Sequence, residues 1–424
     1  MGLADVVTRM VGPDVPIEFT AYDGSRSGSA SAPVRLDVRS PLAMSYLASA
    51  PGELGLARAY VSGTLDVVGD MYTALASLPE LTLNQVPSDV RTQLVLRMIA
   101  ARLWWPVAPP VQERRSKAGL GRLREFGRRH SKTRDSKVIA HHYDVSNTFY
   151  EWVLGPSMAY TCACYPTEDA TLEQAQDHKF DLVSRKLALR PGMRLLDVGC
   201  GWGGMVMHAA KHYGVKALGV TLSQRQAEWA QRAIADAGLS DLAEVRYQDY
   251  RDVTETDFDA VSSIGLTEHI GQANVPAYFR FLHGKMRPGA RILNHCITRP
   301  NSRHPAEVGA FIDRYVFPDG ELETSGELVT VMQDNGFEVR HQENLREHYA
   351  KTLHGWCDNL NAHWDEAVAE VGNGMARVWR LYMAASRLGF HRNFIQLHQV
   401  LGVKPDGGRS GMPLRPDWEP PATF

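Results

Sequence analysis

The chain has 424 residues, of which 44% are hydrophobic, so it is long enough for two or three domains with substantial cores. Its 46 Lys and Arg residues nearly balance its 48 Asp and Glu residues, and the formal net charge of -2 argues against a dedicated nucleic-acid-binding protein. The five cysteines include no Cys-x-x-Cys pair, so neither a disulfide framework nor a metal site is expected. No secretory signal and no apolar run of about 18 residues is visible, and we therefore expect a cytoplasmic protein without a membrane span.

Residues 1–112 predict a small α+β domain without a catalytic cluster. Residues 24–33 (GSRSGSASAP) have the composition of a loop, and residues 34–38 (VRLDV) alternate as a strand does. Residues 41–48 have a helical pattern, and residues 55–70 predict a helix that ends in a glycine-marked turn.

Residues 113–137 form a basic segment, which we expect to link two domains. Ten Lys or Arg residues stand against three acidic residues, which gives a local charge of +7, and Trp104 and Trp105 end the amphipathic pattern just before it. One interpretation is a solvated linker. The other is a surface that docks on an anionic bilayer, where each Lys or Arg contributes about 1 kcal/mol and Trp favours the headgroup layer.

From residue 138 to residue 424, short apolar runs alternate with helical segments. Strands are predicted at residues 194–198, 215–220, 243–247, 258–263 and 291–295, and an apolar strand-like run follows a late helix at residues 394–400. This alternation predicts an α/β domain with a parallel sheet and helices on both faces.

The strongest motif is LLDVGCGWGG at residues 195–204, where a strand ends in Asp197 and leads into Gly199, Gly201 and Gly203. Glycine lets the backbone approach a ligand closely, and such sheets bind ligands at their carboxyl edge. The acid before the glycines suits the amino group of S-adenosylmethionine (AdoMet). The next strand also lacks the acidic residue that the ribose of a nicotinamide cofactor requires. We predict a Rossmann-like class I AdoMet-dependent methyltransferase fold, against the alternative of a tight turn without a ligand.

Further cofactor contacts are expected after the next two strands. Thr221, Leu222 and Gln226 are placed for the ribose and adenine, and Tyr250 is placed to stack on the adenine ring. For each of these residues a plain surface loop is the alternative.

A second cluster of polar residues does not fit cofactor binding. Glu268 and His269 follow the fourth predicted strand, Cys162 precedes the first strand, and His295 ends the fifth. These groups are candidates for one small polar pocket, although a His or Glu at a strand end is often only structural.

Taken in order, the motifs resemble those of the cyclopropane-fatty-acyl-phospholipid synthases and the related mycolic-acid methyltransferases, from about residue 137 to residue 400. The N-terminal region is similar to the extra domain of the longer members. The resemblance is carried by HYDVSNTFYEWVLGPSMAYTCA (142–163), LRPGMRLLDVGCGWGG (189–204), GVTLSQRQ (219–226), SIGLTEHIG (263–271), YVFPDGEL (315–322), HYAKTLHGW (348–356) and FIQLHQV (394–400).

This resemblance implies specific site residues. The residues implied to contact AdoMet are Tyr160, Thr161, the glycine loop, Thr221, Leu222, Gln226, Tyr250 and Arg251. The residues implied to hold a bicarbonate ion beside the reacting carbons are Cys162, Glu268, His295, Ile297 and Tyr349. One departure is that Thr267 replaces a family phenylalanine. Another is that Ser386 replaces a late family cysteine, so no covalent cysteine step is predicted.

The resemblance implies transfer of a methyl carbon from AdoMet to the cis double bond of an unsaturated phospholipid acyl chain. The enzyme would work while peripherally associated with the inner face of the membrane. Aromatic faces would stabilise a carbocation, and bicarbonate would take the proton. The same residues serve a cyclopropane product or a methylene branch that a separate reductase would saturate. Similarity to the actinobacterial branched-fatty-acid members favours the methylene branch.

Two other classes of function stay open: a methyltransferase for a soluble small-molecule or acyl-carrier substrate, and a non-catalytic lipid-binding module. No nucleic-acid partner is expected, and the sequence is compatible with a homo-oligomer.

Overall fold

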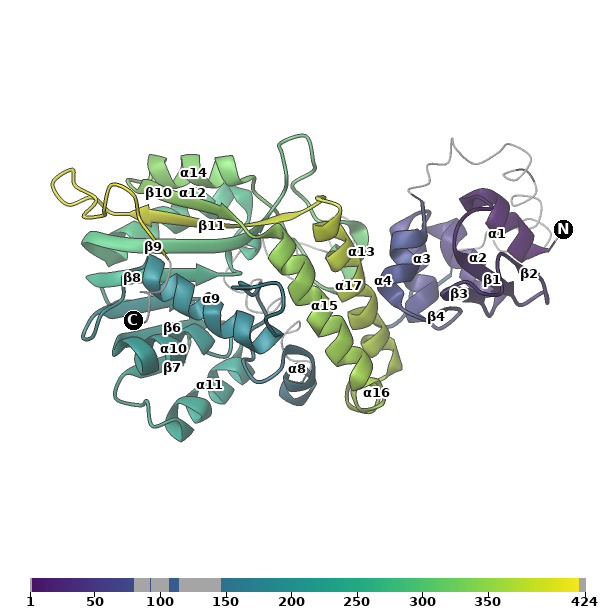
Figure 1. The fold of residues 1–424 in the computed structure, drawn as a ribbon, viewed down its shortest axis with the longest axis horizontal. Helices are drawn as coiled ribbons and strands as arrows, with labels where there is room; N and C mark the ends of the chain where they lie inside the picture. Colours follow the sequence, from purple (N-terminus) through teal and green to yellow (C-terminus); the bar gives the residue numbers. More distant parts are fainter. Residues whose placement is uncertain (1, 80–91, 93–106, 114–145, 419–424) are drawn as a thin grey trace. The chain divides into compact units, whose positions relative to one another are not determined.

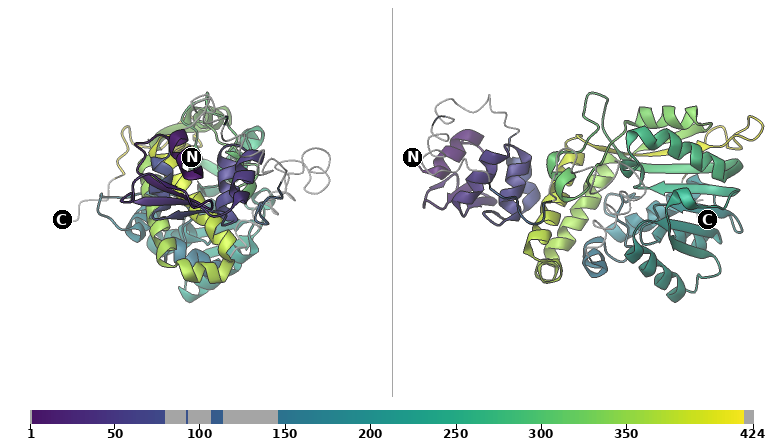
Figure 2. Two further views of the ribbon diagram at one scale, coloured as in Figure 1. Left: turned by 90° about the vertical axis from the view of Figure 1, so that its right-hand side faces the viewer. Right: turned by 180° about the vertical axis from the view of Figure 1, so that it is seen from behind.

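The computed structural model of the chain, drawn in Figure 1 and from two further sides in Figure 2, describes residues 2–79, 92, 107–113 and 146–418. Apart from Glu113, the basic segment lies outside the described residues, as do Trp104 and Trp105. The linker and its membrane-docking role therefore stay predictions. Within the described ranges, no helix is both long enough and apolar enough to cross a bilayer.

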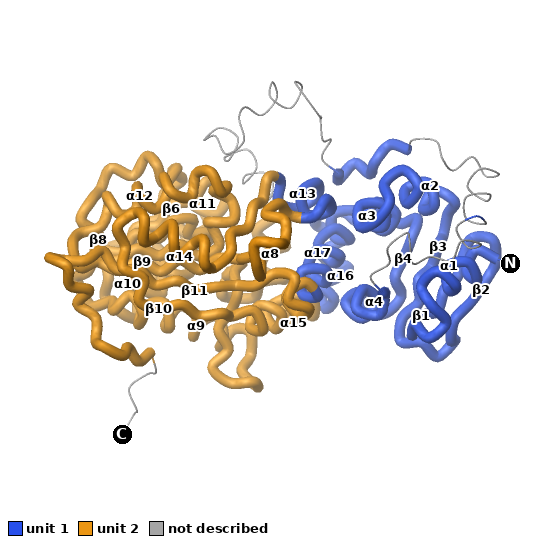
Figure 3. Tube along the Cα trace, turned by 90° about the horizontal axis from the view of Figure 1, so that it is seen from above, with its two compact units in different colours: residues 1–116, 309–318, 360–388 blue, residues 117–308, 319–359, 389–424 orange. Residues whose placement is uncertain are grey.

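The chain divides into two compact units, and neither is continuous in sequence (Figure 3). Unit 1 combines residues 1–116 with residues 309–318 and 360–388, and unit 2 combines residues 117–308, 319–359 and 389–424. The sequence analysis expected continuous domains and assigned both later segments of unit 1 to the methyltransferase domain.

Unit 1 is built on a four-stranded sheet of order β2-β1-β3-β4. Its elements before residue 80 are α1 (Leu3–Val11), β1 (Ile17–Ala21), β2 (Arg26–Ser27), β3 (Val34–Val38), α2 (Pro41–Ser49), α3 (Glu53–Val61), β4 (Leu65–Val68) and α4 (Met71–Ser77). The structure confirms β3 and α2. The prediction at residues 55–70 missed β4, in which buried Leu65 and Val67 alternate with more exposed residues and pair with β3.

Buried charges join the distant segments within unit 1. The Glu113 carboxylate accepts two hydrogen bonds of 2.6 Å from Arg58 on α3 and one of 2.9 Å from Arg314 on α13 (Ala310–Tyr315). Arg377 on α17 (Asn373–His391) donates to the carbonyl oxygen of Tyr60 at 2.6 Å. The bonds of Arg314 and Arg377 thus tie residues 309–318 and 360–388 to the first segment of the unit, and they help to specify this discontinuous unit.

Unit 2 contains a seven-stranded sheet of order β10-β11-β9-β8-β5-β6-β7. Its strands are β5 (Arg194–Val198), β6 (Lys216–Thr221), β7 (Ala243–Tyr247), β8 (Phe258–Ile264), β9 (Met286–Thr298), β10 (Glu338–Asn344) and β11 (Gln396–Val403). All five strands predicted before residue 300 are present. These five strands are parallel to one another, as predicted. The late apolar run forms β11, which runs antiparallel to β9 and β10, and its direction was not predicted. An apolar run has the same pattern in either direction, so periodicity alone does not determine strand direction.

Helices cover both faces of this sheet, as predicted (Figure 1). Successive strand residues such as Leu195 and Leu196 belong to opposite core layers, because side chains alternate along a strand. One layer packs against α9 (Leu172–Lys186), α10 (Gly204–Tyr213) and α11 (Gln224–Asp236), and the other packs against α12 (Val275–Lys285) and α14 (Ser325–Asp334). Among the described residues, unit 2 also contains α8 (Asn147–Leu154), most of α15 (Arg346–Ala362) and the short 3-10 turns η1 (Tyr250–Asp252), η2 (Thr267–His269) and η3 (Gln272–Asn274), whereas α16 (Trp364–Val371) belongs to unit 1.

The strand order creates a crevice beside β5. The chain leaves β5 for β6 and β7 on one side and later enters β8 on the other. The carboxyl ends of β5 and β8 therefore form a topological switch point, which is where α/β sheets bind their ligands.

Candidate active site

The turn after β5 has a backbone that glycine adopts most readily. Gly199 and Gly201 have φ angles of 75° and 56°, and the Gly199 N–H donates to the carbonyl oxygen of Val220 at 2.9 Å. A Cβ atom at Gly199 would lie 3.1 Å from the Leu266 side chain, whereas the nearest atom to a Cβ at Gly201 would be Gln226 Nε2 at 3.9 Å. A side chain at position 199 would therefore press on Leu266, whereas a Cβ at position 201 would make an ordinary contact at the edge of both pockets.

Two pockets meet at this loop and share Gly199, Gly201, Gln226 and Gly265. Together they gather every predicted cofactor residue except Gly203. The first pocket adds Thr221, Leu222, Tyr250 and Arg251, and the second adds Tyr160, Thr161 and Asp197. A Cβ at Gly203 would lie 3.2 Å from Ala230, so this glycine permits the packing of α10 on α11 and lines neither pocket.

The first pocket combines an aromatic ring with hydrogen-bonding groups. The ring of Tyr250 is held edge-on by Tyr278, with ring centroids 5.1 Å apart, and Arg251 pairs with Asp249 at 2.6 Å. The Thr221 hydroxyl donates to Gln226 Oε1 at 2.8 Å. This arrangement suits a nucleoside.

The second pocket contains a buried acid. Asp197 is 2% exposed, and its carboxylate accepts a 2.6 Å hydrogen bond from the Ser262 hydroxyl. Burial raises the pKa of Asp197 to about 6, while Ser262 and Lys179 act in the opposite direction. Asp197 is therefore mainly ionised at neutral pH, and it can bind an ammonium group.

The sequence analysis did not single out Lys179 on α9. Its buried ammonium group interacts with several of the site residues. Lys179 is fully buried, and its ammonium group donates to Thr161 Oγ1 at 2.8 Å and to Gln176 Oε1 at 2.7 Å. Burial lowers the pKa of Lys179 to about 8, while Cys164, Cys162 and Asp197 raise it. The helical pattern of residues 172–186 could have identified this lysine. Lys179 and Lys186 are two helical turns apart and lie on the apolar side of α9, where a lysine is unusual.

Glu268, in η2, has one carboxylate oxygen engaged and one without a partner. Oε1 accepts the backbone N–H of Ile297 at 2.8 Å, whereas Oε2 is buried and has no hydrogen-bond partner among the described residues. Burial raises the pKa of Glu268 to about 7, and the Ile297 N–H lowers it. A buried acceptor without a partner is costly, and it favours a ligand that donates a hydrogen bond there.

His295 is oriented by a relay of side chains that the sequence analysis also missed. Lys186, which forms an ion pair with Glu343, donates to Gln399 Oε1 at 2.6 Å. This contact orients the amide so that Gln399 Nε2 faces His295 Nδ1 at 3.2 Å. Because the amide donates, Nδ1 accepts and the imidazole proton resides on Nε2.

The Nε2 atom of His295 is buried and has no hydrogen-bond partner in the described part of the chain. Burial, together with the charges of Lys179 and Lys186, keeps the pKa of His295 well below its usual value. The neutral ring therefore presents a single donor, which suits an anionic or carbonyl oxygen.

The five predicted anion-site residues do not line the two pockets, but Glu268 and His295 lie next to residues that do. The Gly265 N–H donates to the carbonyl oxygen of His295 at 2.8 Å, and Gly265 lines both pockets. Leu266 and His269, on either side of Glu268, line the first pocket, and Glu268 holds the N–H of Ile297.

Cys162 and Tyr349 complete the predicted set. Cys162 is fully buried, its thiol donates to the carbonyl oxygen of Ala163 at 3.2 Å, and burial raises its pKa well above the usual value. The sulfur therefore stays a thiol. Tyr349 packs its ring 4.4 Å from that of Phe390.

A run of aromatic rings connects the second pocket to Tyr349. Tyr150 lies between Trp202 and Tyr160, with ring centroids 4.7 Å and 5.9 Å away. Trp356 continues the run, 5.4 Å from Tyr160 and 6.0 Å from Tyr349. Aromatic faces of this kind stabilise a nearby positive charge.

The doubly wound sheet and the glycine loop at its switch point define a class I AdoMet-dependent methyltransferase. Residues 130–400 match the family described as mycolic acid cyclopropane synthetase, and the chain belongs to this family. It is thus an AdoMet-dependent methyltransferase of the cyclopropane synthase type.

Named relatives and solved structures agree with this assignment. The chain is 57% identical over 410 residues to a "Probable fatty acid methyltransferase" of Mycobacterium tuberculosis, covering 96% of this chain and 95% of the relative. It is 30% identical to the "Cyclopropane-fatty-acyl-phospholipid synthase" of Escherichia coli, covering 89% and 90% of the two chains. The cyclopropane synthase MmaA2 of Mycobacterium tuberculosis matches with a TM-score of 0.61 and 31% identity, covering 63% of this chain and 98% of that one. The mycolic acid cyclopropane synthase CmaA1, solved in complex with SAH and CTAB, matches with a TM-score of 0.60 and 32% identity, covering 63% and 98%.

Gly201→Val is expected to abolish AdoMet binding, because the valine side chain would enter the space of the two pockets, both of which Gly201 lines. Gly238→Val is the matched control: Gly238 has a similar φ of 67°, and a Cβ there meets nothing within 4 Å. Both variants carry the same type of backbone strain, but only the first alters the pocket. Calorimetry with AdoMet checks the result, and equal AdoMet affinity in both variants would contradict the placement.

Proposed function

We propose that this enzyme transfers a methyl carbon from AdoMet to the cis double bond of an unsaturated acyl chain in a phospholipid. Similarity to a fatty acid methyltransferase and to a cyclopropane-fatty-acyl-phospholipid synthase supports a lipid acyl substrate. The aromatic run from Trp202 to Tyr349 supports chemistry that passes through a cation.

The observation that carries the proposal is the pair of unpartnered buried atoms, Glu268 Oε2 and His295 Nε2. One is an acceptor and the other a donor, and both residues border the cofactor pockets. Bicarbonate offers the complementary groups, a hydroxyl and anionic oxygens, and this match of donor and acceptor supports it as the ligand. When bound, this ion would supply a base that is effective near neutral pH.

The chain's own residues then have separate tasks. Asp197 would hold the amino group of AdoMet, and Tyr250 with Thr221 would hold its nucleoside. His295 would donate from Nε2 to the anion while Glu268 would accept from it, and Gln399 would keep His295 in the required tautomer. Positioning of this kind can account for a large share of a rate enhancement, because it replaces diffusion with alignment.

Two products are compatible with these residues. Proton loss from the added carbon would close a cyclopropane ring, and a hydride shift before proton loss would leave a methylene branch for a separate reductase. We favour the methylene branch on the sequence resemblance described above. The predicted acyl-chain pocket does not correspond to either cofactor pocket, and it remains part of the proposal.

The test is incubation of the full chain with AdoMet and oleoyl-phospholipid vesicles, followed by mass spectrometry of the acyl chains. The expected result is an acyl chain heavier by one CH2. The two products are isomers, so ozonolysis is needed to distinguish them: it cleaves a methylene branch and leaves a cyclopropane intact.

The alternatives predict different outcomes in the same assay. A methyltransferase for a soluble substrate leaves the vesicle lipids unchanged and is active without vesicles. A lipid-binding module binds AdoMet and vesicles without any turnover. Either result would overturn the phospholipid proposal.

We also propose peripheral association with an anionic membrane through the basic segment. Replacing Arg114, Arg115, Arg128 and Arg129 with Gln is expected to weaken binding to anionic vesicles by up to about 4 kcal/mol and to flatten its salt dependence. The control removes the same charge from four exposed positions elsewhere, Arg190, Arg232, Arg303 and Arg409. Vesicle sedimentation measures both variants, and equal binding would show that the segment is only a linker.

A further inference from the structure

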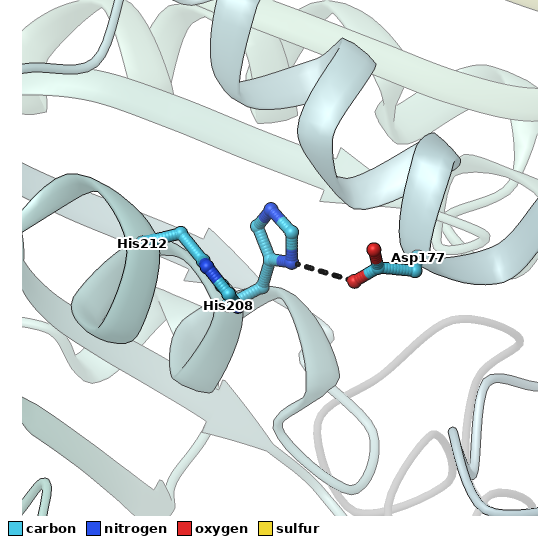
Figure 4. A group of neighbouring side chains, drawn as sticks. All are labelled: Asp177, His208 and His212. Atoms are coloured by element: carbon cyan, nitrogen blue, oxygen red, sulfur yellow. Dashed lines mark ion pairs between the residues drawn. The ribbon is translucent and has the colours of Figure 1, made fainter. Parts of the chain in front are cut away.

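Three side chains with metal-binding groups converge between α9 and α10, outside the site described above (Figure 4). Asp177 comes from α9, and His208 and His212 come from consecutive turns of α10. One ligand atom from each residue lies within 4.8 Å of the other two, and the described residues contain no second group of this kind.

The geometry is already close to that of a coordinated ion. His208 Nδ1 lies 3.4 Å from Asp177 Oδ1, and the two imidazole rings have centroids 4.6 Å apart. In a tetrahedral zinc site with bonds of about 2.0–2.1 Å, neighbouring ligand atoms are about 3.3 Å apart. Asp177 and His208 therefore need almost no movement to bind a common ion. The His212 side chain is exposed, so no packed core prevents it from turning toward that ion.

The surroundings fix one ligand and leave the others accessible. His208 is only 8% exposed, and its ring packs against the rings of Phe180 at 5.8 Å and Tyr213 at 6.1 Å. Asp177 and His212 are exposed, so an ion can reach the cluster from solvent. Because packing already holds His208 rigidly, less conformational entropy is lost when the site becomes ordered around an ion.

We propose that Asp177, His208 and His212 form a binding site for a divalent transition-metal ion of the zinc type. Two imidazole nitrogens and one carboxylate oxygen suit Zn²⁺, Co²⁺ or Ni²⁺, whereas Mg²⁺ and Ca²⁺ prefer ligand sets made of oxygen. Solvent would complete the coordination. This inference goes beyond the proposed function and departs from the sequence analysis, which expected no metal.

The site would link two helices that also form the cofactor pocket. Phe180 on α9 and Met205 on α10 line the second pocket, and a Cβ at Gly204 would meet the Phe180 ring at 2.7 Å. A bound ion would thus hold α9 and α10 together near their contact beside the second pocket. None of the three ligands lines either pocket, so their loss should leave AdoMet binding intact.

The test uses the full chain without a histidine tag, titrated with Zn²⁺ in a calorimeter and with Co²⁺ in a spectrophotometer. We expect one Zn²⁺ per chain and a rise in melting temperature, because the ion binds only the folded state. His212→Ala should lower Zn²⁺ affinity by about tenfold or more, and Asp177→Asn should do the same. The Co²⁺ spectrum should lack a thiolate charge-transfer band, which separates this site from binding at the half-buried Cys200.

His354→Ala provides the matched control, because His354 forms a two-residue pair with Asp358 at 3.5 Å on α15 and both side chains are exposed. This variant should bind Zn²⁺ as the wild type does. AdoMet affinity measured on all variants verifies that they are folded. The proposal is overturned if the wild type binds no Zn²⁺, if His212→Ala binds Zn²⁺ as tightly as His354→Ala, or if Mg²⁺ displaces the bound ion at equal concentration.

Discussion

Glu268→Gln is expected to lower turnover by a factor on the order of 10² to 10⁴, the scale of losing a positioned general base. The glutamine carbonyl can still accept the Ile297 N–H, which now bonds Glu268 Oε1 at 2.8 Å. The amide nitrogen, however, would replace Oε2 with a donor, so the hydroxyl of a bound bicarbonate would lose its acceptor. AdoMet affinity should not change, because Glu268 lines neither of the two pockets in which we place the cofactor.

Added bicarbonate should restore part of the activity of Glu268→Gln, because a weakened site can be refilled by mass action. Rates of wild type and variant are compared in carbonate-free buffer with and without bicarbonate. Glu347→Gln serves as the control, since its carboxylate is 83% exposed and lies outside the site. Wild-type activity that is indifferent to bicarbonate would refute the assignment of Cys162, Glu268, His295, Ile297 and Tyr349 as an anion site. It would leave the acyl-chain reaction itself untouched.

Asp197→Asn is expected to weaken AdoMet binding by about 2–5 kcal/mol, the cost of removing one partner of a buried charged contact. The wild type should also show a pH dependence that the variant lacks. The pKa of Asp197 in the free protein is raised to about 6, and an ammonium group bound beside it would lower that value. AdoMet affinity should therefore be greatest above pH 6 and should fall as the pH drops through 6, by at most about tenfold per pH unit.

Two further variants make this test specific. In the wild type, the Ser262 hydroxyl donates to Asp197 at 2.6 Å and thereby lowers the pKa of this carboxyl group. Ser262→Ala removes the hydroxyl, so the midpoint of the pH dependence of AdoMet affinity should move to higher pH. Asp241→Asn, at an exposed position, should leave the profile unchanged. The α-amino group of AdoMet stays protonated through this range, with a usual pKa of about 7.7–8.0, so it does not produce the effect. An affinity that is flat from pH 5 to pH 7 in the wild type would contradict the role of Asp197.

The sequence by itself determined those features of the protein that are encoded by residues close together in the chain. Strand β5, the glycine loop and α10 form one continuous segment, so Asp197, Gly199 and Gly201 could be placed at the switch point from a single motif. The apolar runs of β6, β7 and β8 likewise identified the sheet, because the alternation of side chains is a local property. The positions of Glu268 and His295 at strand ends also marked them as site candidates, and the family resemblance added Ile297 and Tyr349.

Only the tertiary structure determined which distant groups meet. Gln399 reaches His295 across 104 positions, and their contact requires β11 to pair antiparallel with β9, a direction that apolar periodicity does not encode. Asp177 joins His208 only because α9 packs on α10, although the spacing of His208 and His212 was visible in the chain. Residues 360–388 belong to unit 1 through long-range contacts such as that of Arg377 with Tyr60. Such contacts depend on burial and charge pairing between segments that are far apart in sequence. Bringing these segments together costs loop-closure entropy, and each contact becomes favourable only when folding of the intervening chain offsets that cost.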